Sequence, residues 1–179
     1  ACVKAVDMNE VKTVMDIGTG AGFPGVPLKI AFPHLEACLL DSLKKRVNFL
    51  EETFELLKLE NITAIHGRAE EFAKNKAYRE KYDLCVSRAV SNLATLSEYC
   101  LPYVKVGGKF ISYKSGTVKE EVEQAEKAVS ILGGKIKDVV YFNLPDSEIQ
   151  RSLVVIKKIK STPGKYPRKA GTPLKEPLV

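Results

Sequence analysis

A cluster of glycines early in the chain has the spacing of a loop that lies against a ligand. The apolar run at residues 14–17 ends at Gly18, and Gly20, Gly22 and Gly25 follow closely. Glycine tolerates positive φ and lets the backbone approach a bound molecule closely. We therefore predict a buried strand, a tight turn and then a helix, with the turn forming part of a ligand site.

Two classes of ligand use such a turn, and the carboxylate of Asp16 helps to separate them. Dinucleotide sites place G-x-G-x-x-G after a strand, with an acidic residue about 20 residues later. A match begins at Gly20 with Asp41 near the expected place, but Gly18 already ends the strand. Asp16 would crowd a pyrophosphate, whereas it would favour the cationic end of S-adenosylmethionine. We favour S-adenosylmethionine; a dinucleotide, or a glycine-rich turn without a ligand, is the alternative.

The hydrophobic pattern around this loop predicts alternating strands and helices. The predicted strands cover residues 12–18, 36–40, 62–65, 83–87, 109–113, 135–144 and 152–159. The predicted helices cover residues 24–32, 43–57 (capped by Ser42), 68–76, 93–102 and 118–132. Repeated strand–helix units predict an α/β fold with a mostly parallel sheet and helices on both faces. The last two strands have no helix between them and should pair antiparallel, as in the Rossmann-like class I methyltransferase sheet of seven strands.

Chemically useful residues follow several of these strands. Asp16–Phe23, Asp41, Ala69–Glu70 and Arg88 all lie where a predicted strand ends. Ligands of open parallel sheets bind beyond the carboxyl ends of the strands. We therefore expect these residues to meet at one edge, and the strand-end position of Asp41 suits a contact with ribose hydroxyls.

The C-terminal stretch differs in composition from the rest of the chain. The chain carries a net charge of +6 with a pI of about 9.0, which suits a polyanionic partner. Residues 157–179 hold seven Lys or Arg residues and one acidic residue, and their prolines forbid a regular helix. We predict a methyltransferase domain at residues 1–160 and a basic proline-rich arm at 161–179. A disordered tail is the alternative.

Basic residues near the predicted site and in the arm are the candidate RNA contacts. Each contact with a phosphate would release counterions and steepen the salt dependence of binding. Tyr166 could stack on a base. The candidates are Lys114, Lys165, Arg168 and Lys169, with Arg88 at the rim of the pocket.

The remaining composition narrows the class of protein. The four cysteines have no metal-binding spacing, so we expect no metal site and a reducing, cytoplasmic location. No apolar run approaches the ~20 residues that span a bilayer, so we expect no membrane partner. We also expect a monomer. The chain begins at Ala1 rather than Met, and we expect an N-terminal segment to be missing.

Several motifs together resemble the RsmG (GidB) family of bacterial small-subunit rRNA guanine-N7 methyltransferases. The resemblance runs from about Lys12 to the C-terminus. Its markers are DIGTGAGFPGVPL at 16–28, DSLKKRVNFL at 41–50, GRAEEF at 67–72, SRAV at 87–90 and KYPRKAGTPLKEPL at 165–178. Members of this family carry an N-terminal helical segment of several dozen residues that is absent here.

The resemblance implies an enzyme, its cofactor and its substrate. It implies methyl transfer from S-adenosylmethionine to guanine 527 in the 530 loop of 16S rRNA, within the small ribosomal subunit. It places Ala69 and Glu70 on the adenine side of the cofactor. The expected cofactor contacts are Gly18, Gly20, Phe23, Asp41, Ala69, Glu70 and Arg88.

Guanine N7 presents an in-plane lone pair, so the reaction requires no general base, and we name no catalytic residue. Alignment of the reactants can contribute about 7–11 kcal/mol to such a transfer. Because side chains cannot read the deep major groove of A-form RNA, the target should lie in a loop or be turned outward. An S-adenosylmethionine-dependent methyltransferase with a non-RNA substrate and a cofactor-free RNA-binding module are the alternatives.

Overall fold

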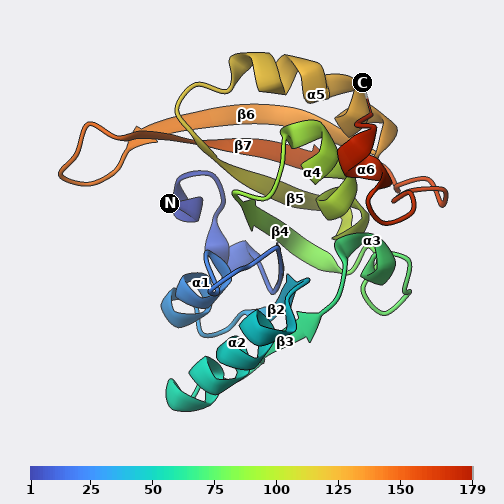
Figure 1. Ribbon diagram of the computed structural model, residues 1–179. Coiled ribbons are helices and arrows are strands. Elements are labelled where there is room, and N and C mark those ends of the chain that lie inside the picture. The colour runs from blue at the N-terminus through green and yellow to red at the C-terminus, as the bar shows by residue number, and fades with distance from the viewer. Residues whose placement is uncertain (179) are drawn as a thin grey trace.

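The chain folds into one seven-stranded sheet with helices on both faces (Figure 1). The computed structural model describes residues 1–178. The strands are β1 (Thr13–Ile17), β2 (Glu36–Asp41), β3 (Ile62–His66), β4 (Tyr82–Arg88), β5 (Val104–Ser115), β6 (Gly134–Asn143) and β7 (Gln150–Lys158). Their order is β3-β2-β1-β4-β5-β7-β6, with β7 antiparallel to both β5 and β6 and the other pairs parallel. The predicted class I fold with its closing hairpin is confirmed.

Two layers of helices cover the sheet because adjacent strand residues point to opposite faces. The helices are α1 (Gly25–Ala31), α2 (Lys44–Leu56), α3 (Ala69–Phe72), α4 (Leu93–Cys100), α5 (Lys119–Ile131) and α6 (Thr172–Lys175). Three short 3₁₀ turns cover Cys2–Lys4, Met8–Glu10 and Leu101–Tyr103. Met15 of β1 packs in the cluster that holds α4 and α5, whereas Leu39 of β2 packs with α1 and α2. No helix within residues 1–178 is both long and apolar enough to cross a bilayer.

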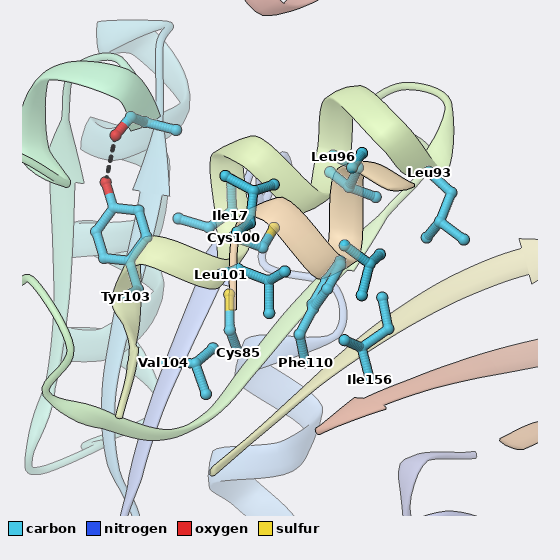
Figure 2. Close-up of a cluster of buried hydrophobic side chains, with 14 of the residues drawn as sticks. Ile17, Cys85, Leu93, Leu96, Cys100, Leu101, Tyr103, Val104, Phe110 and Ile156 are labelled. Carbon is cyan, nitrogen blue, oxygen red and sulfur yellow. Dashed lines mark hydrogen bonds between the residues drawn. The ribbon is translucent and has the colours of Figure 1, made fainter. Parts of the chain in front are cut away.

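The largest of the three buried hydrophobic clusters joins α4 to the sheet (Figure 2). Tyr103 is fully buried there, and its hydroxyl donates a hydrogen bond to the Ala69 carbonyl at 2.7 Å. This bond holds the start of α3, which follows β3 at the carboxyl edge of the sheet. Cys85 and Cys100 lie in the same cluster, and burial raises the pKa of the Cys100 thiol. All four cysteines are free and buried.

Several predicted element boundaries are wrong, and each has a local physical reason. Ser42 does not cap α2; the Leu43 amide instead donates to Asp41 Oδ1 at 2.9 Å. The helix expected over 68–76 ends at Phe72. β5 begins at Val104, so the glycine pair lies inside the strand rather than before it. The strand continues through the pair because Gly107 adopts a φ of +92° and the register with β4 shifts at this irregularity.

Candidate cofactor site at the strand ends

A pocket of about 210 Å³ opens at the carboxyl ends of β1 and β2 and the loops after β3 and β4. This edge lies beside the switch point, since the strand order reverses between β1 and β4. Four of the predicted cofactor contacts line the pocket: Gly18, Asp41, Ala69 and Glu70. The structure therefore brings together residues that three separate strands deliver to one edge.

The glycine turn gives this pocket its first wall. The Gly18 amide donates to the Leu40 carbonyl at 2.8 Å, which ties the turn to the end of β2. Gly18 has a φ of +68°, and a Cβ at this position would lie 2.5 Å from Val90 Cγ2. Only glycine fits between the turn and the loop after β4. Because Gly18 has no side chain, a nucleoside can lie directly against the backbone of the turn.

Asp41 connects the turn, β2 and α2 through its carboxylate. Its Oδ2 atom accepts a hydrogen bond from the Gly20 amide at 2.9 Å and from Arg46 Nη1 at 3.3 Å. Its Oδ1 atom accepts from the Leu43 amide at 2.9 Å. A carboxylate has about four acceptor sites, so one remains for a ribose hydroxyl. Gly20 does not line the pocket and acts on it through Asp41.

Asp16 shapes the turn from beneath it. It is fully buried, and its Oδ2 atom accepts hydrogen bonds from Thr19 Oγ1 and the Gly25 amide, both at 2.8 Å. Burial raises the pKa of Asp16 to about 6, against these two hydrogen bonds. Asp16 is not among the residues that line the pocket, and its expected place beside the cofactor's cationic end stays a prediction. Its carboxylate holds the glycine turn closed.

Phe23 and Arg88 lie in a second, adjoining cleft of about 980 Å³. The Arg88 guanidinium sits 5.3 Å from the centroid of the Phe23 ring, which is a cation–π contact. The loop after β4 separates the two hollows, since Arg88 and Ala89 line the larger one and Val90 lines the smaller. These two predicted cofactor contacts therefore stand at the boundary between the cofactor pocket and a more open cleft.

The four candidate RNA contacts divide into two pairs. Lys114 Nζ pairs with Glu121 Oε1 at 2.6 Å, and Arg168 Nη2 pairs with Glu98 Oε2 at 2.7 Å. Lys165 and Lys169 are exposed, and neither has an ion pair within residues 1–178. The paired cations are thus engaged with the protein itself, whereas the exposed lysines are free to meet phosphates.

Other expectations about the C-terminal stretch also change in the structure. Tyr166 is only 8% exposed, so the expectation that it stacks on a base is wrong. Lys158 belongs to β7 and is fully buried, so it adds nothing to the outward charge of residues 157–178. Residues 161–178 of the predicted arm pack against the domain through hydrogen bonds at Thr162 and Arg168, and position 179 lies outside the described residues.

Several residues that line the smaller pocket were not predicted as cofactor contacts, among them Val90, Tyr99 and Leu174. Val90 belongs to the SRAV motif, and Leu174 to the C-terminal motif that we had interpreted as an RNA contact. Tyr99 lies on α4, and burial raises the pKa of its hydroxyl to about 12, so it is neutral at physiological pH. No local signal marks Tyr99, because its place depends on how α4 packs.

Comparisons with known proteins settle the family. A family model described as GidB, rRNA small subunit methyltransferase G, matches residues 1–154. The chain belongs to this family. The predicted family is confirmed, and with it the expectation of a methyltransferase.

Named relatives of the rRNA small subunit methyltransferase G family cover nearly the whole chain. A protein of that name from Lachnoclostridium phytofermentans is 56% identical over 177 residues, which are 99% of this chain and 73% of the relative. One from Acetivibrio thermocellus is 58% identical over 165 residues, which are 92% of this chain and 68% of the relative.

Solved structures with the same fold are far more distant in sequence. The StiE O-MT domain has a TM-score of 0.67 and 19% identity, covering 87% of this chain and 71% of that one. TYW2 from Pyrococcus horikoshii, solved in complex with MeSAdo, has a TM-score of 0.66 and 14% identity, covering 84% of this chain and 58% of that one. These two likenesses support the fold alone.

Proposed function

We propose that this chain transfers a methyl group from S-adenosylmethionine to N7 of guanine 527 in the 530 loop of 16S rRNA. The observation that carries the proposal is the pocket at the strand ends. It holds Gly18, Asp41, Ala69 and Glu70 in a chain more than half identical to named rRNA small subunit methyltransferases G. That these residues contact the cofactor stays a prediction.

The residues present fit the cofactor by shape and by chemistry. Gly18 leaves the space that a Cβ would fill, and Leu40 and Val90 supply apolar surface for a purine. Asp41 accepts hydrogen bonds from the ribose hydroxyls of the cofactor, and Ala69 and Glu70 lie beside its adenine ring. S-adenosylmethionine, when bound, supplies a methyl group activated by its sulfonium.

The adjoining cleft is the proposed place of the acceptor base. Phe23 and Tyr113 line it with aromatic surface, and Arg88 stands at its border with the cofactor pocket. Aromatic and guanidinium faces are the surfaces on which unstacked RNA bases rest. The work of these residues is orientation, because guanine N7 already carries its lone pair and no proton must be removed first.

We also propose a monomer that acts in the cytoplasm, where small ribosomal subunits are assembled in bacteria. Within residues 1–178, no group of three or more His, Cys, Asp or Glu side chains is arranged to hold a metal ion.

Mass mapping of 16S rRNA tests the proposed reaction directly. Cells with the gene should carry one methyl group on guanine 527, and cells without it should lack only that mark. The purified chain and labelled S-adenosylmethionine should restore the mark on small subunits from the deleted strain. An rRNA modification pattern that is identical in both strains would refute the proposed substrate.

The two exposed lysines of the arm should set part of the RNA affinity. We expect Lys165→Ala combined with Lys169→Ala to lower the slope of log affinity against log salt by about 1.4, since each phosphate contact contributes about 0.7 for a single strand. The affinity for S-adenosylmethionine should not change. Filter binding with the 530-loop RNA at several salt concentrations measures the slope.

Lys12→Ala combined with Lys81→Ala is the matched control for this arm variant. Both lysines are exposed and precede the parallel strands β1 and β4, at the sheet edge opposite the pocket. This control removes the same charge and should leave the slope unchanged. Equal salt slopes for the arm variant and the control would show that Lys165 and Lys169 do not contact the RNA.

A further inference from the structure

The stretch after β7 is fixed to the domain by polar groups that are largely shielded from water. Arg79 donates from Nη2 to the Thr162 carbonyl at 2.8 Å and from Nη1 to the Tyr166 carbonyl at 2.9 Å. Thr162 Oγ1 donates to the Leu132 carbonyl at 2.7 Å. Each of these bonds satisfies a backbone carbonyl of the stretch or of the domain. The stretch therefore leaves β7 in a defined direction.

A buried ion pair fixes the next part of the stretch. Glu98 of α4 is fully buried, and its carboxylate accepts hydrogen bonds from the Arg168 amide at 2.8 Å and from Arg168 Nε at 3.0 Å. Arg168 Nη2 also donates to the Glu176 carbonyl at 2.7 Å. Burying a carboxylate costs free energy unless it is paired and hydrogen-bonded. Arg168 supplies both the charge and the hydrogen bonds that Glu98 needs at this position.

The stretch then reaches the pocket itself. The Gly171 amide donates to Glu70 Oε1 at 2.9 Å, and Thr95 Oγ1 donates to the Pro173 carbonyl at 3.0 Å. Leu174 lines the smaller pocket and is 60% exposed, which is unusual for a leucine in a docked segment. Figure 1 shows α6 next to α4, on the side of the sheet that carries α4 and α5.

We infer that residues 166–178 form a wall of the cofactor pocket, with Leu174 facing the nucleoside and with Arg168 and Glu98 as positioning residues. The inference rests on the proposed function, because it takes S-adenosylmethionine as the occupant of this pocket. It assigns Arg168 to cofactor binding rather than to RNA. It also explains why Glu70 accepts a hydrogen bond from a residue 101 positions away in the sequence.

Two variants separate this role from a general loss of stability. Leu174→Ala removes the exposed side chain from the wall without disturbing the core, and should weaken S-adenosylmethionine binding about tenfold. Arg168→Gln leaves Glu98 unpaired and should weaken binding by at least about tenfold. Lys175→Gln is the control, since it removes one charge from an exposed neighbour of Leu174. Isothermal titration calorimetry with S-adenosylmethionine measures all three.

Kinetics and hydrogen exchange give measurements that would not change if Leu174 and Arg168 only stabilised the fold. Leu174→Ala should raise the KM for S-adenosylmethionine about tenfold and leave kcat and the KM for the RNA unchanged. Binding and docking of the wall are linked, so saturating cofactor should slow exchange of the Gly171 amide in the wild type. The same slowing should be lost in Arg168→Gln.

The outcomes distinguish failure of the inference from failure of the proposed function. If the wild type binds the cofactor and Leu174→Ala and Arg168→Gln bind it equally well, the wall is refuted and the proposed function stands. If the wild type does not bind S-adenosylmethionine, both are overturned. If Arg168→Gln fails to fold, the result for Leu174→Ala decides alone.

Discussion

Gly18→Val is expected to weaken S-adenosylmethionine binding at least about a hundredfold, equivalent to about 2.7 kcal/mol. Valine would place its Cβ 2.5 Å from Val90 Cγ2, and its two methyl groups would occupy the pocket itself. A φ of +68° is also strained for a β-branched residue. Calorimetry gives the affinity, and methylation of small subunits should fall in parallel.

Gly107→Val is the matched control for this effect. Gly107 also has a positive φ, of +92°, but nothing lies within 4 Å of its Cβ position, and it sits near the start of β5, away from the pocket. The control should suffer backbone strain of about 1–3 kcal/mol and keep its cofactor affinity. Wild-type affinity in Gly18→Val would show that the cofactor binds elsewhere.

Lys158→Met is expected to lower the free energy of unfolding by about 3 kcal/mol. Lys158 Nζ is fully buried and donates to the Leu101 carbonyl at 2.6 Å and to Thr162 Oγ1 at 2.7 Å. It also pairs with Glu80 at 3.1 Å. Methionine fills the volume but removes all three interactions, so the Leu101 carbonyl and Glu80 are left with the backbone amides of Val104 and Thr162 as donors. The melting temperature should fall by roughly 6–12 °C, as measured by calorimetry.

The stability contributed by Lys158 should depend on pH with a defined sign. Burial lowers the pKa of Lys158 to about 8 from 10.5, against the charge of Glu80. Between about pH 8 and 10.5 the unfolded chain therefore holds this proton and the folded chain does not, so stability from this group rises with pH. The advantage of the wild type over Lys158→Met should grow between pH 8 and pH 10 in urea titrations.

Lys157→Met tests whether burial is the cause. Lys157 is the exposed neighbour on β7, so the same substitution there should change stability by less than about 0.5 kcal/mol and show no comparable pH effect. Equal losses in the two variants would contradict the assignment of a structural role to the buried ammonium group.

Much of the fold and part of the site could be predicted because their signals are local. A strand that ends in glycine, an acid at the end of the next strand and an Ala-Glu pair after the third can each be recognised from neighbours in the sequence. Parallel strands then carry such ends to the same edge, as Gly18, Asp41 and Glu70 show. The closing hairpin was equally readable, since no helix separates β6 from β7.

The burial of charges could not be predicted in the same way. Lys158 and Lys157 are adjacent and chemically identical, yet one is fully buried and the other exposed. Arg168 and Lys169 both counted as arm charges, but only Arg168 meets a carboxylate. A count of basic residues measures the charge of a segment and says nothing of which charges face outward.

Local patterns thus sufficed for the strand order along the chain, the carboxyl-edge pocket and the family. Only the packed fold revealed that Glu98 lies opposite Arg168 and Glu70 opposite Gly171, at separations of 70 and 101 residues. The physical reason is the sequence separation of the interacting residues. Turns and the hydrophobic periodicity of helices and strands depend on residues that are close in the sequence. The partner of a buried charge depends on which distant segments the sheet and its helices bring together.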